Sequence, residues 1–352
     1  MTVFLNRIST VVPPTDVHHM FVEFATGLLR GTRSIPVFER LAQRSQIEHR
    51  WSVLGLGGDV GGVDAIDLYR PGAFPSTASR MRLFERFAAD LAFKAVDGLD
   101  LGAGLSDVTH VIAVSCTGLS APGLDLQIVQ RCGLNPSVER TVIGFMGCYA
   151  SVNALKLARH IVRSDPASRV LIVSVELCSL HLQETTDLEQ VLSFLVFGDG
   201  CAAALVSSDP VGLSLDRFHA ALLPEAADQI TWRVGDQGFD MFLSGQVPSS
   251  VGTALRRGRD SILDGAAVGD IDLWAIHPGG RSVLDAVQNA LELEAPALGA
   301  SREVLRRYGN MSSATLLFVL QRLMADAEAG HRGCAMAFGP GLTAETLLFT
   351  AA

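Results

Sequence analysis

The sequence lacks the features that mark several common classes of protein. It has no block of lysine and arginine, and 28 basic against 37 acidic side chains give it a formal charge of −9. An acidic chain of this kind argues against nucleic acid as the main partner. It also lacks an uninterrupted apolar run of about 18 residues, so we expect no helix that crosses a membrane and no membrane insertion.

Paired cysteines are absent as well. The six cysteines form no Cys-x-x-Cys pair, which argues against a zinc site and against the disulfide framework of a small secreted domain. The first residues lack the charged and apolar regions of a signal peptide. We therefore expect a protein of the reducing cytoplasm that holds no metal. The cysteines are Cys116, Cys132, Cys148, Cys178, Cys201 and Cys334.

The chain does have the composition of a globular protein with a large core. Of its 352 residues 48% are hydrophobic, and the length suits two fused halves or one large domain. Apolar runs bounded by turns predict buried strands, and they alternate with helical patterns, which is typical of a layered α/β protein. We predict strands at 1–12, 110–115, 141–145, 169–176, 199–207, 271–276, 333–341 and 346–351, and helices at 17–29, 37–45, 76–97, 251–263 and 282–293.

Two interior helices are predicted in corresponding places. One begins at Gly147-Cys148 and has small or apolar residues on most of its circumference, and the other follows Gly309-Asn310. Each is followed by a pair of strands, so the order of elements repeats. We therefore predict two duplicated α/β halves, residues 1–208 and 209–352, that share one core.

Cys148 stands at the start of the first interior helix. A thiol in that place faces free N–H groups and the positive end of the helix dipole, which favour the thiolate and lower the pKa. The alternative is that Cys148 simply packs, since free cysteine is among the most buried residue types. The segment alone leaves both interpretations open.

Two further polar side chains stand at the ends of buried elements. His277 ends an apolar strand before Pro-Gly-Gly, where glycines allow a ligand to approach, and Asn310 opens the second interior helix. Histidine can act as a base toward a thiol and as a donor to a carbonyl oxygen. The amide of asparagine suits the stabilisation of an enolate or oxyanion. Together with Cys148 they predict covalent acyl chemistry.

These stretches resemble the signature stretches of the type III polyketide synthases, the chalcone synthase-like branch of the thiolase superfamily, and the match includes bacterial members. The resemblance extends in order over nearly the whole chain. It rests on Gly147-Cys148, Phe197-Gly198-Asp199-Gly200, His277-Pro278-Gly279-Gly280, Gly309-Asn310-Met311-Ser312-Ser313 and Phe338-Gly339-Pro340-Gly341-Leu342-Thr343.

The resemblance implies a thiolase-like fold with a layered αβαβα core, a homodimer, and acyltransferase activity. An acyl-CoA starter would acylate Cys148. His277 and Asn310 would hold the thioester carbonyl of malonyl-CoA during decarboxylation, and the carbanion would attack the acyl group. Coenzyme A thioesters are then substrates, and no cofactor is needed.

Other positions take their roles from the same resemblance. The coenzyme A site would include Arg40, Arg44, Gly279, Gly280 and Arg281, whereas Val37 stands where the family has a third cation. Phe197 matches an aromatic gatekeeper, and the small Ala121 lies in a loop that reaches the partner subunit. The remaining pocket residues are Cys116, Glu176, Cys178, His181, Trp232, Met241, Ser312 and Phe338.

The resulting hypothesis is iterative decarboxylative Claisen condensation of malonyl-CoA onto an acyl-CoA starter, followed by cyclisation to a pyrone, a resorcinol or a related aromatic product. Because His181 and Trp232 are bulky, the cavity is expected to differ from that of a chalcone-forming enzyme. The alternative is a ketoacyl synthase III-like enzyme of fatty-acid synthesis, which performs one condensation. A His-Gln-Ala-Asn stretch would favour that alternative, and this chain has His277-Pro-Gly-Gly.

Overall fold

Nine strands are hydrogen-bonded side by side in the computed structural model, which describes residues 1–55 and 63–352. The pairs β13/β14, β6/β7 and β6/β8 are parallel, and the other neighbours are antiparallel. In spatial order the strands are β13 (Leu273–Ile276), β14 (Arg332–Gly339), β15 (Thr343–Ala351), β10 (Leu213–Leu222), β1 (Phe4–Val11), β9 (Asp199–Ser207), β8 (Val170–Leu177), β6 (His110–Ser115) and β7 (Glu139–Gly144).

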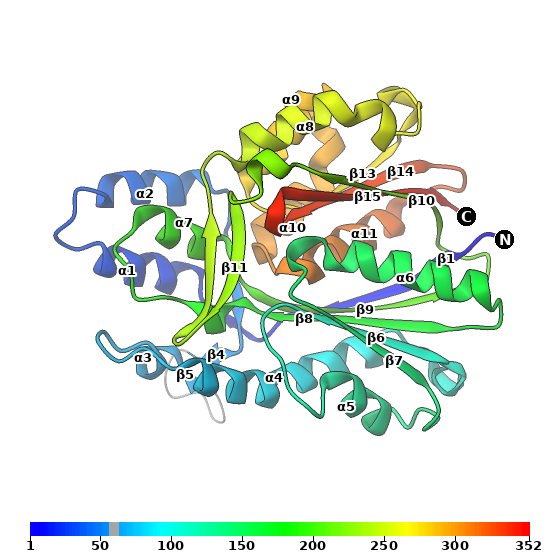
Figure 1. The fold of residues 1–352 in the computed structure, drawn as a ribbon, viewed down its shortest axis with the longest axis horizontal. Helices are drawn as coiled ribbons and strands as arrows, with labels where there is room; N and C mark the ends of the chain where they lie inside the picture. The colour runs from blue at the N-terminus through cyan, green and yellow to red at the C-terminus, as the bar shows by residue number, and fades with distance from the viewer. Residues whose placement is uncertain (56–62) are drawn as a thin grey trace.

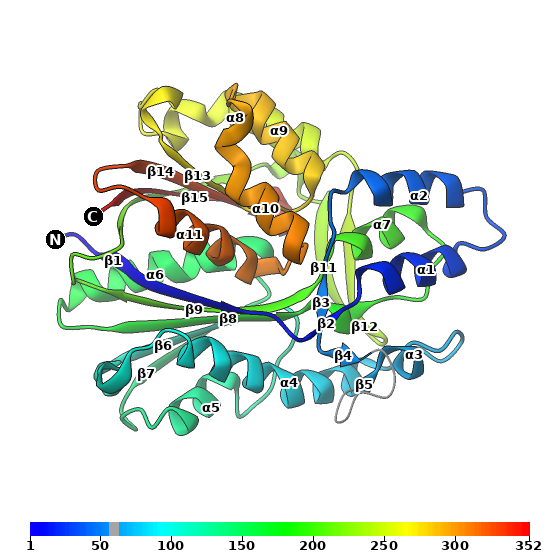
Figure 2. The ribbon, with the colours of Figure 1, turned by 180° about the vertical axis from the view of Figure 1, so that it is seen from behind.

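The row of strands divides between β10 and β1. These two strands pair only through Phe4 with Ser214 and Leu5 with Leu213, whereas β1 pairs along its length with β9. Beyond that contact the two parts separate, and the two interior helices lie between them (Figures 1 and 2). These helices are α6 (Ala150–Ser164) and α11 (Thr315–Asp326).

Helices also cover the two outer faces. In Figure 1, α4 (Thr77–Asp97) and α5 (Leu124–Arg131) lie below the lower strands, while α8 (Val247–Ile262) and α9 (Arg281–Leu291) lie above the upper ones. The order is therefore helix, strand, helix, strand, helix, and the predicted layered αβαβα core is confirmed. α10 (Gly299–Tyr308) packs against α11 and α9.

Burial on both faces explains the apolar character of the central strands. Every residue of β8 is buried, since α4 packs on one side of it and α6 on the other. A strand covered on both faces reads as a continuous apolar run without alternation. β9 carries Ala202, Ala203 and Ala204, whose small side chains allow helices to approach closely on both sides.

The remaining elements gather at one end of the layers (Figure 1). Among the described residues, no helix is both long and apolar enough to span a membrane. A two-stranded arm made of β11 (Ile230–Gly235) and β12 (Gly238–Leu243) crosses this end. The others are α1 (His18–Leu28), α2 (Ile35–Arg44), α3 (Ala65–Leu68), α7 (Leu188–Val196), and the short pairs β2 (Thr15–Asp16) with β3 (Trp51–Ser52) and β4 (Leu54–Gly55) with β5 (Val63–Asp64).

The boundaries of two helices differ from the prediction. α8 begins at Val247, four residues before the predicted start, because a proline at the first turn of a helix costs no hydrogen bond. Cys148 lies in a 3₁₀ turn, Gly147–Tyr149, that leads directly into α6 at Ala150. The cysteine is therefore at the helix entrance, as predicted, within a tighter turn.

Leu155 tests the layer between the two sheets. Its side chain is fully buried on α6, so we expect Leu155→Ala to lower the free energy of unfolding by about 2–5 kcal/mol through lost burial and the cavity left behind. Urea denaturation measures this. Leu222→Ala is the matched control, because Leu222 is 66% exposed at the end of β10, and it should cost less than about 0.5 kcal/mol. Equal losses would contradict the buried layer.

Candidate active site

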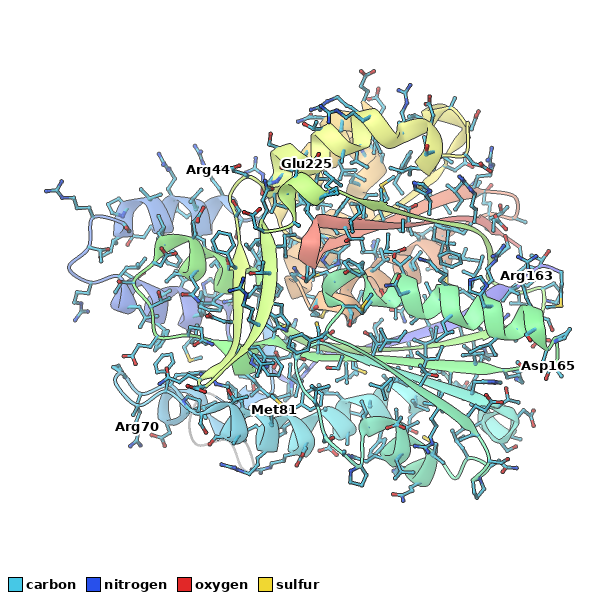
Figure 3. All side chains as sticks on the ribbon, viewed as in Figure 1. Arg44, Arg70, Met81, Arg163, Asp165 and Glu225 are labelled. Carbon is cyan, nitrogen blue, oxygen red and sulfur yellow. The ribbon has the colours of Figure 1, made fainter. Side chains whose placement is uncertain are left out.

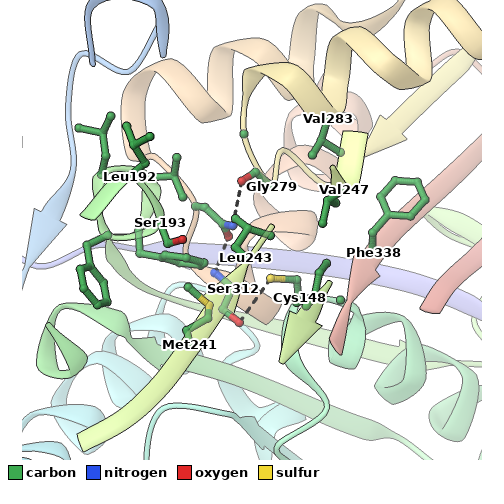
Figure 4. A pocket seen from close by; sticks show the side chains of 18 of the residues that line it. Cys148, Leu192, Ser193, Met241, Leu243, Val247, Gly279, Val283, Ser312 and Phe338 are labelled. Carbon is green, nitrogen blue, oxygen red and sulfur yellow. Dashed lines mark hydrogen bonds between the residues drawn. The ribbon is translucent and has the colours of Figure 1, made fainter. Parts of the chain in front are cut away.

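A cavity of about 490 Å³ lies where the two interior helices begin. Its walls come from both halves of the chain, from α7 and from the inner face of the arm. Cys148, His277 and Asn310 all line it, so the structure brings together the three groups that the sequence analysis selected. Figure 4 shows Cys148 and Ser312 facing one another, with Met241 and Leu243 of the arm nearby.

The turn that holds Cys148 depends on glycine. Gly147 has φ +75°, and a Cβ there would lie 2.3 Å from Cδ of Pro340. Only glycine tolerates both conditions, so the sequence Gly-Cys lets the chain enter α6 against the loop after β14. The Cys148 thiol points into the cavity, 3.8 Å from Oγ of Ser312.

The predicted low pKa of Cys148 is wrong for the thiol by itself. Burial raises the pKa of Cys148 to about 11 and outweighs hydrogen bonds from Ser312 and Asn310, which lower it. Desolvation disfavours a charge wherever compensating groups are few. A helix entrance is therefore insufficient here, and a proton acceptor in the cavity is needed to generate the thiolate.

His277 can accept that proton. Its backbone N–H donates to the carbonyl oxygen of Met336 at 2.8 Å, which fixes it at the end of β13. Neither ring nitrogen has a hydrogen-bond partner among the described residues, and burial lowers the pKa of His277 to about 3. The ring is therefore neutral in the empty cavity, with one nitrogen free to accept a proton and the other free to donate.

The orientation of the Asn310 side chain follows from its own hydrogen bonds. Its Oδ1 accepts from the backbone N–H of Ser312 at 2.8 Å, and its Nδ2 donates to the carbonyl oxygen of Gly279 at 3.4 Å. Since the oxygen is occupied, the amide N–H₂ is the part available to a ligand. This group can stabilise negative charge on an oxygen without titrating.

A second thiol and a buried carboxyl group lie beside this site. Sγ of Cys116 is 3.1 Å from Oε1 of Glu176 and 3.0 Å from Oγ of Ser312. Glu176 also accepts from Thr117 and Ser313. The expectation that Glu176 lines the cavity is wrong, because Cys116 stands between it and the cavity. Burial raises the pKa of Glu176 and, well above its usual value, that of Cys116.

An aromatic cluster forms one wall of the cavity. The His181 ring stacks on Phe239 with centroids 4.3 Å apart, its Nδ1 accepts from the N–H of Phe239, and its Nε2 donates to the carbonyl oxygen of Thr117 at 2.7 Å. Burial lowers the pKa of His181 to about 3, so the ring stays neutral. Trp232 donates to the carbonyl oxygen of Cys116 at 2.8 Å. Both bulky side chains are thus held rigidly.

The cations expected to bind coenzyme A divide into two groups. Arg44 and Arg281 line the cavity, and Nη1 of Arg281 donates to the carbonyl oxygen of Arg44 at 3.1 Å. Figure 3 shows Arg44 at the end of α2 that faces the arm. Arg40 is on the exposed surface of α2 and does not line the cavity. The other predicted lining residues that the structure places there are Cys116, Cys178, His181, Phe197, Trp232, Met241, Gly279, Gly280, Ser312 and Phe338.

Sequence reasoning missed most of the apolar lining. α7 and the arm supply much of it, and neither element was predicted. The run from Leu188 to Val196 does carry a helical apolar pattern after an Asp187 N-cap, which could have identified α7. No signal in the sequence places α7 at the cavity. The missed residues include Leu192, Leu195, Val196, Ile230, Leu243, Val247 and Val283.

The arrangement is suited to one kind of chemistry. It offers a thiol nucleophile, a neutral imidazole and an amide donor in an apolar cavity, and within residues 1–55 and 63–352 no cluster of histidine, cysteine and acidic side chains could hold a metal ion. Together with the αβαβα layers, these groups define an acyl-transferring condensing enzyme of the thiolase-like class.

Comparison with known proteins identifies the family within that class. The N-terminal domain of chalcone and stilbene synthases matches residues 32–210, and their C-terminal domain matches residues 215–352. The chain therefore belongs to the chalcone and stilbene synthase family, the type III polyketide synthases. It is accordingly an acyltransferase that extends an acyl-CoA starter by iterative condensation with malonyl-CoA, and the alternative of a single-condensation enzyme of fatty-acid synthesis is set aside.

Individual relatives agree with this assignment. The chain is 36% identical over 286 residues to the alpha-pyrone synthesis polyketide synthase-like Pks18 of Mycobacterium tuberculosis, a match that covers 77% of this chain and 72% of that protein. It is 34% identical over 288 residues to the bisdemethoxycurcumin synthase of Oryza sativa subsp. japonica, with 75% and 70% covered.

Solved structures show the same fold. PKS-I from the brown alga Ectocarpus siliculosus superimposes with a TM-score of 0.89 at 29% identity, covering 100% of this chain and 98% of that one. The 1,3,6,8-tetrahydroxynaphthalene synthase of Streptomyces coelicolor, a bacterial type III polyketide synthase, gives 0.88 at 28% identity, with 99% of both chains covered. The predicted thiolase-like fold is thereby confirmed.

The reactivity of Cys148 tests the role of His277 as proton acceptor. In His277→Ala no imidazole is left to take the thiol proton, and burial still holds the pKa of Cys148 above its usual value. We expect alkylation by iodoacetamide near neutral pH to fall about tenfold or more. The rate should then rise steadily with pH, without the plateau that an assisted thiolate gives.

Cys148→Ser identifies the alkylated residue by mass spectrometry. An unchanged pH profile in His277→Ala would show that another group ionises the thiol.

Proposed function

We propose that this enzyme loads an aliphatic acyl starter on Cys148, extends it with malonyl-CoA and releases a pyrone or resorcinol-type product, as a homodimer in the cytoplasm. The observation that carries the proposal is that the thiol, the imidazole and the amide line one apolar cavity. The relative Pks18 is named as an alpha-pyrone synthesis polyketide synthase-like protein, which supports the class of product.

Loading begins with the neutral pair of Cys148 and His277. His277 takes the thiol proton as the sulfur attacks the thioester carbonyl of the starter, which avoids a solitary buried thiolate. Coenzyme A leaves as the thiol after it receives a proton, and the acyl group remains on sulfur. The mouth between Arg44 and Arg281 supplies positive charge for the coenzyme A phosphates.

Extension uses Asn310 and His277 as hydrogen-bond donors. Nδ2 of Asn310 and an N–H of His277 hold the malonyl thioester oxygen, so that loss of CO₂ leaves an enolate that they stabilise. The enolate carbon attacks the acyl carbonyl and expels the Cys148 thiolate. The cavity is apolar, so the carboxylate is poorly solvated there, which favours its loss as neutral CO₂.

The apolar walls favour an aliphatic starter. Leucine and valine side chains of α7, with Leu243 of the arm, line the same cavity as the thiol, and the bulky Trp232 and His181 line it as well. A smaller cavity of about 100 Å³ adjoins the main one and shares Cys178, Phe194 and Phe197 with it. Each methylene group of a starter chain that is buried in such surroundings stabilises binding by about 0.8 kcal/mol.

An exposed edge supports the homodimer. β7 is the last strand of the row and has one unpaired edge, with Val142 54% exposed. The exposed apolar side chains Leu119 and Met146 lie on the loops that follow β6 and β7, and Met146 is two residues before Cys148. Free strand edges with apolar side chains are commonly covered by another chain. Ala121 lies on the same loop as Leu119.

Labelled malonyl-CoA tests the assigned roles. Cys148→Ala should lose acyl loading and all condensation, yet still release CO₂ from malonyl-CoA, because His277 and Asn310 remain. Asn310→Ala should lower CO₂ release about 100-fold or more, since a donor to the developing oxyanion is gone. Scintillation counting and mass spectra of the acylated protein give both quantities. Absence of CO₂ release by the unaltered enzyme with any acyl-CoA would refute the proposal.

A starter panel tests the aliphatic cavity. Leu192→Trp should lower kcat/KM for decanoyl-CoA about tenfold and leave that for acetyl-CoA within about threefold, because only the longer chain needs the space beside α7. Val234→Trp is the matched control, since Val234 is 62% exposed on the same arm that covers the cavity. Equal losses with both starters would contradict an acyl site next to Leu192.

A further inference from the structure

Arg50 is a buried, charged side chain at the end of α7. It is 2% exposed, and within the described residues no carboxylate lies at ion-pair distance from it. Its Nη1 donates to the carbonyl oxygens of Phe194 at 2.8 Å and Phe197 at 2.7 Å. Its Nε donates to Nδ1 of His18 at 3.0 Å. A buried guanidinium held by neutral acceptors is uncommon and requires a reason.

The two carbonyl groups explain where the charge acts. They belong to the last turn of α7, whose C-cap is Phe197. The final carbonyl groups of a helix lack partners within the helix and carry the negative end of its dipole, so a cation there is favourable. Arg50 therefore closes α7 at the residue whose side chain lines both the main cavity and the smaller one.

The carbonyl group of Val196, next to Phe197, connects this turn to Asn310. The backbone carbonyl oxygen of Val196 accepts from the backbone N–H of Asn310 at 2.7 Å. The backbone N–H of Gly198 donates to the backbone carbonyl oxygen of Asn310 at 3.0 Å. Phe197 and Asn310 thus form a parallel bridge. The end of α7 is bound on one side by Arg50 and on the other by the segment that carries the catalytic amide.

Glycine keeps these segments in direct contact. Gly309 has φ +68°, and a Cβ there would lie 2.7 Å from the Val196 oxygen and 2.8 Å from Cγ of Arg50. The Arg50 side chain also lies over the Phe21 ring, with 4.5 Å between the guanidinium carbon and the ring centroid. A displacement of Arg50 is therefore transmitted to the backbone of Gly309 and Asn310 without an intervening side chain.

We propose that Arg50 is a positioning residue that fixes the Asn310 amide and the Phe197 ring together, through the last turn of α7. It lies outside the main cavity, although it does line the smaller one. The proposal rests on the roles proposed above for Asn310 and Phe197. It implies that loss of Arg50 weakens decarboxylation and changes starter selection, while the Cys148 side of the site remains intact.

Arg80 provides a matched control within the same fold. It is fully buried, and its Nη1 donates to the carbonyl oxygens of Leu180 at 2.6 Å and Leu182 at 2.8 Å. Like Arg50, it has an Nη2 without a partner among the described residues. Its contacts hold the turn around His181 and do not reach α7 or Asn310. Loss of either arginine therefore removes a similar set of buried hydrogen bonds.

The test compares Arg50→Met with Arg80→Met. Release of CO₂ from malonyl-CoA without starter should fall about 10- to 100-fold in Arg50→Met, chiefly in kcat, because a small displacement of a catalytic group is costly. In Arg80→Met the release of CO₂ should stay within about threefold of that of the unaltered enzyme, although Tm should fall about as much as in Arg50→Met. Alkylation of Cys148 should change far less than CO₂ release in Arg50→Met, because only the contribution of Asn310 to the thiol is altered. In Arg50→Ala, whose short side chain leaves room for it, millimolar methylguanidinium should restore part of the CO₂ release.

Arg50→Lys keeps the measurement possible if Arg50→Met does not fold. Lysine retains the charge but cannot match the fork of donors, so an intermediate loss of kcat is expected. Equal CO₂ release by Arg50→Met and Arg80→Met, or a loss in Arg50→Ala that methylguanidinium does not reverse, would overturn the inference and leave the proposed function standing. Absence of CO₂ release by the unaltered enzyme would overturn both.

Discussion

Burial of α6 and α11 between two sheets is the constraint on which the site depends. The sides of both helices that pack on the sheets are apolar, whereas α6 keeps Lys156 and Arg163 on its accessible side. The two entrances, Gly147-Cys148 and Gly309-Asn310, open into the same cavity. The packing that stabilises the core thereby also sets the distance between the Cys148 thiol and the Asn310 amide, because neither can move without displacing its helix.

The same burial decides the electrostatics of the reaction. In the dry cavity Cys148 is a thiol and His277 a neutral ring, each with its pKa shifted away from charge. Neither group therefore places a solitary charge in the cavity of the resting enzyme. In the mechanism proposed above, charge arises only during transfer of the proton from Cys148 to His277 and during loss of CO₂ from the malonyl group.

Much of this could be predicted from the sequence, for identifiable reasons. Long apolar runs reveal strands that are covered on both faces, so β8, β9 and the interior helices were found. The layer order was implied by the resemblance to a known family. Cys148, His277 and Asn310 were found because each is a polar residue at the end of a buried strand or helix. The arm and α7 were missed, since their side chains are partly exposed and their place depends on contacts distant in the chain. Glu176 was placed on the wrong side of Cys116 because strand position does not reveal which of two neighbours reaches the cavity.

The strand β1 has a consequence for the order in which the molecule assembles. Its partners are β9 and the start of β10, about 200 residues later in the chain. Contacts so distant in sequence are slow to form because the intervening chain must first be closed into a loop. Until β1 pairs, β9 has an unpaired edge beside a row of alanines. The pairing of β1 thus joins segments that are far apart in the chain, and it places Phe4–Val11 in the middle of the row of strands.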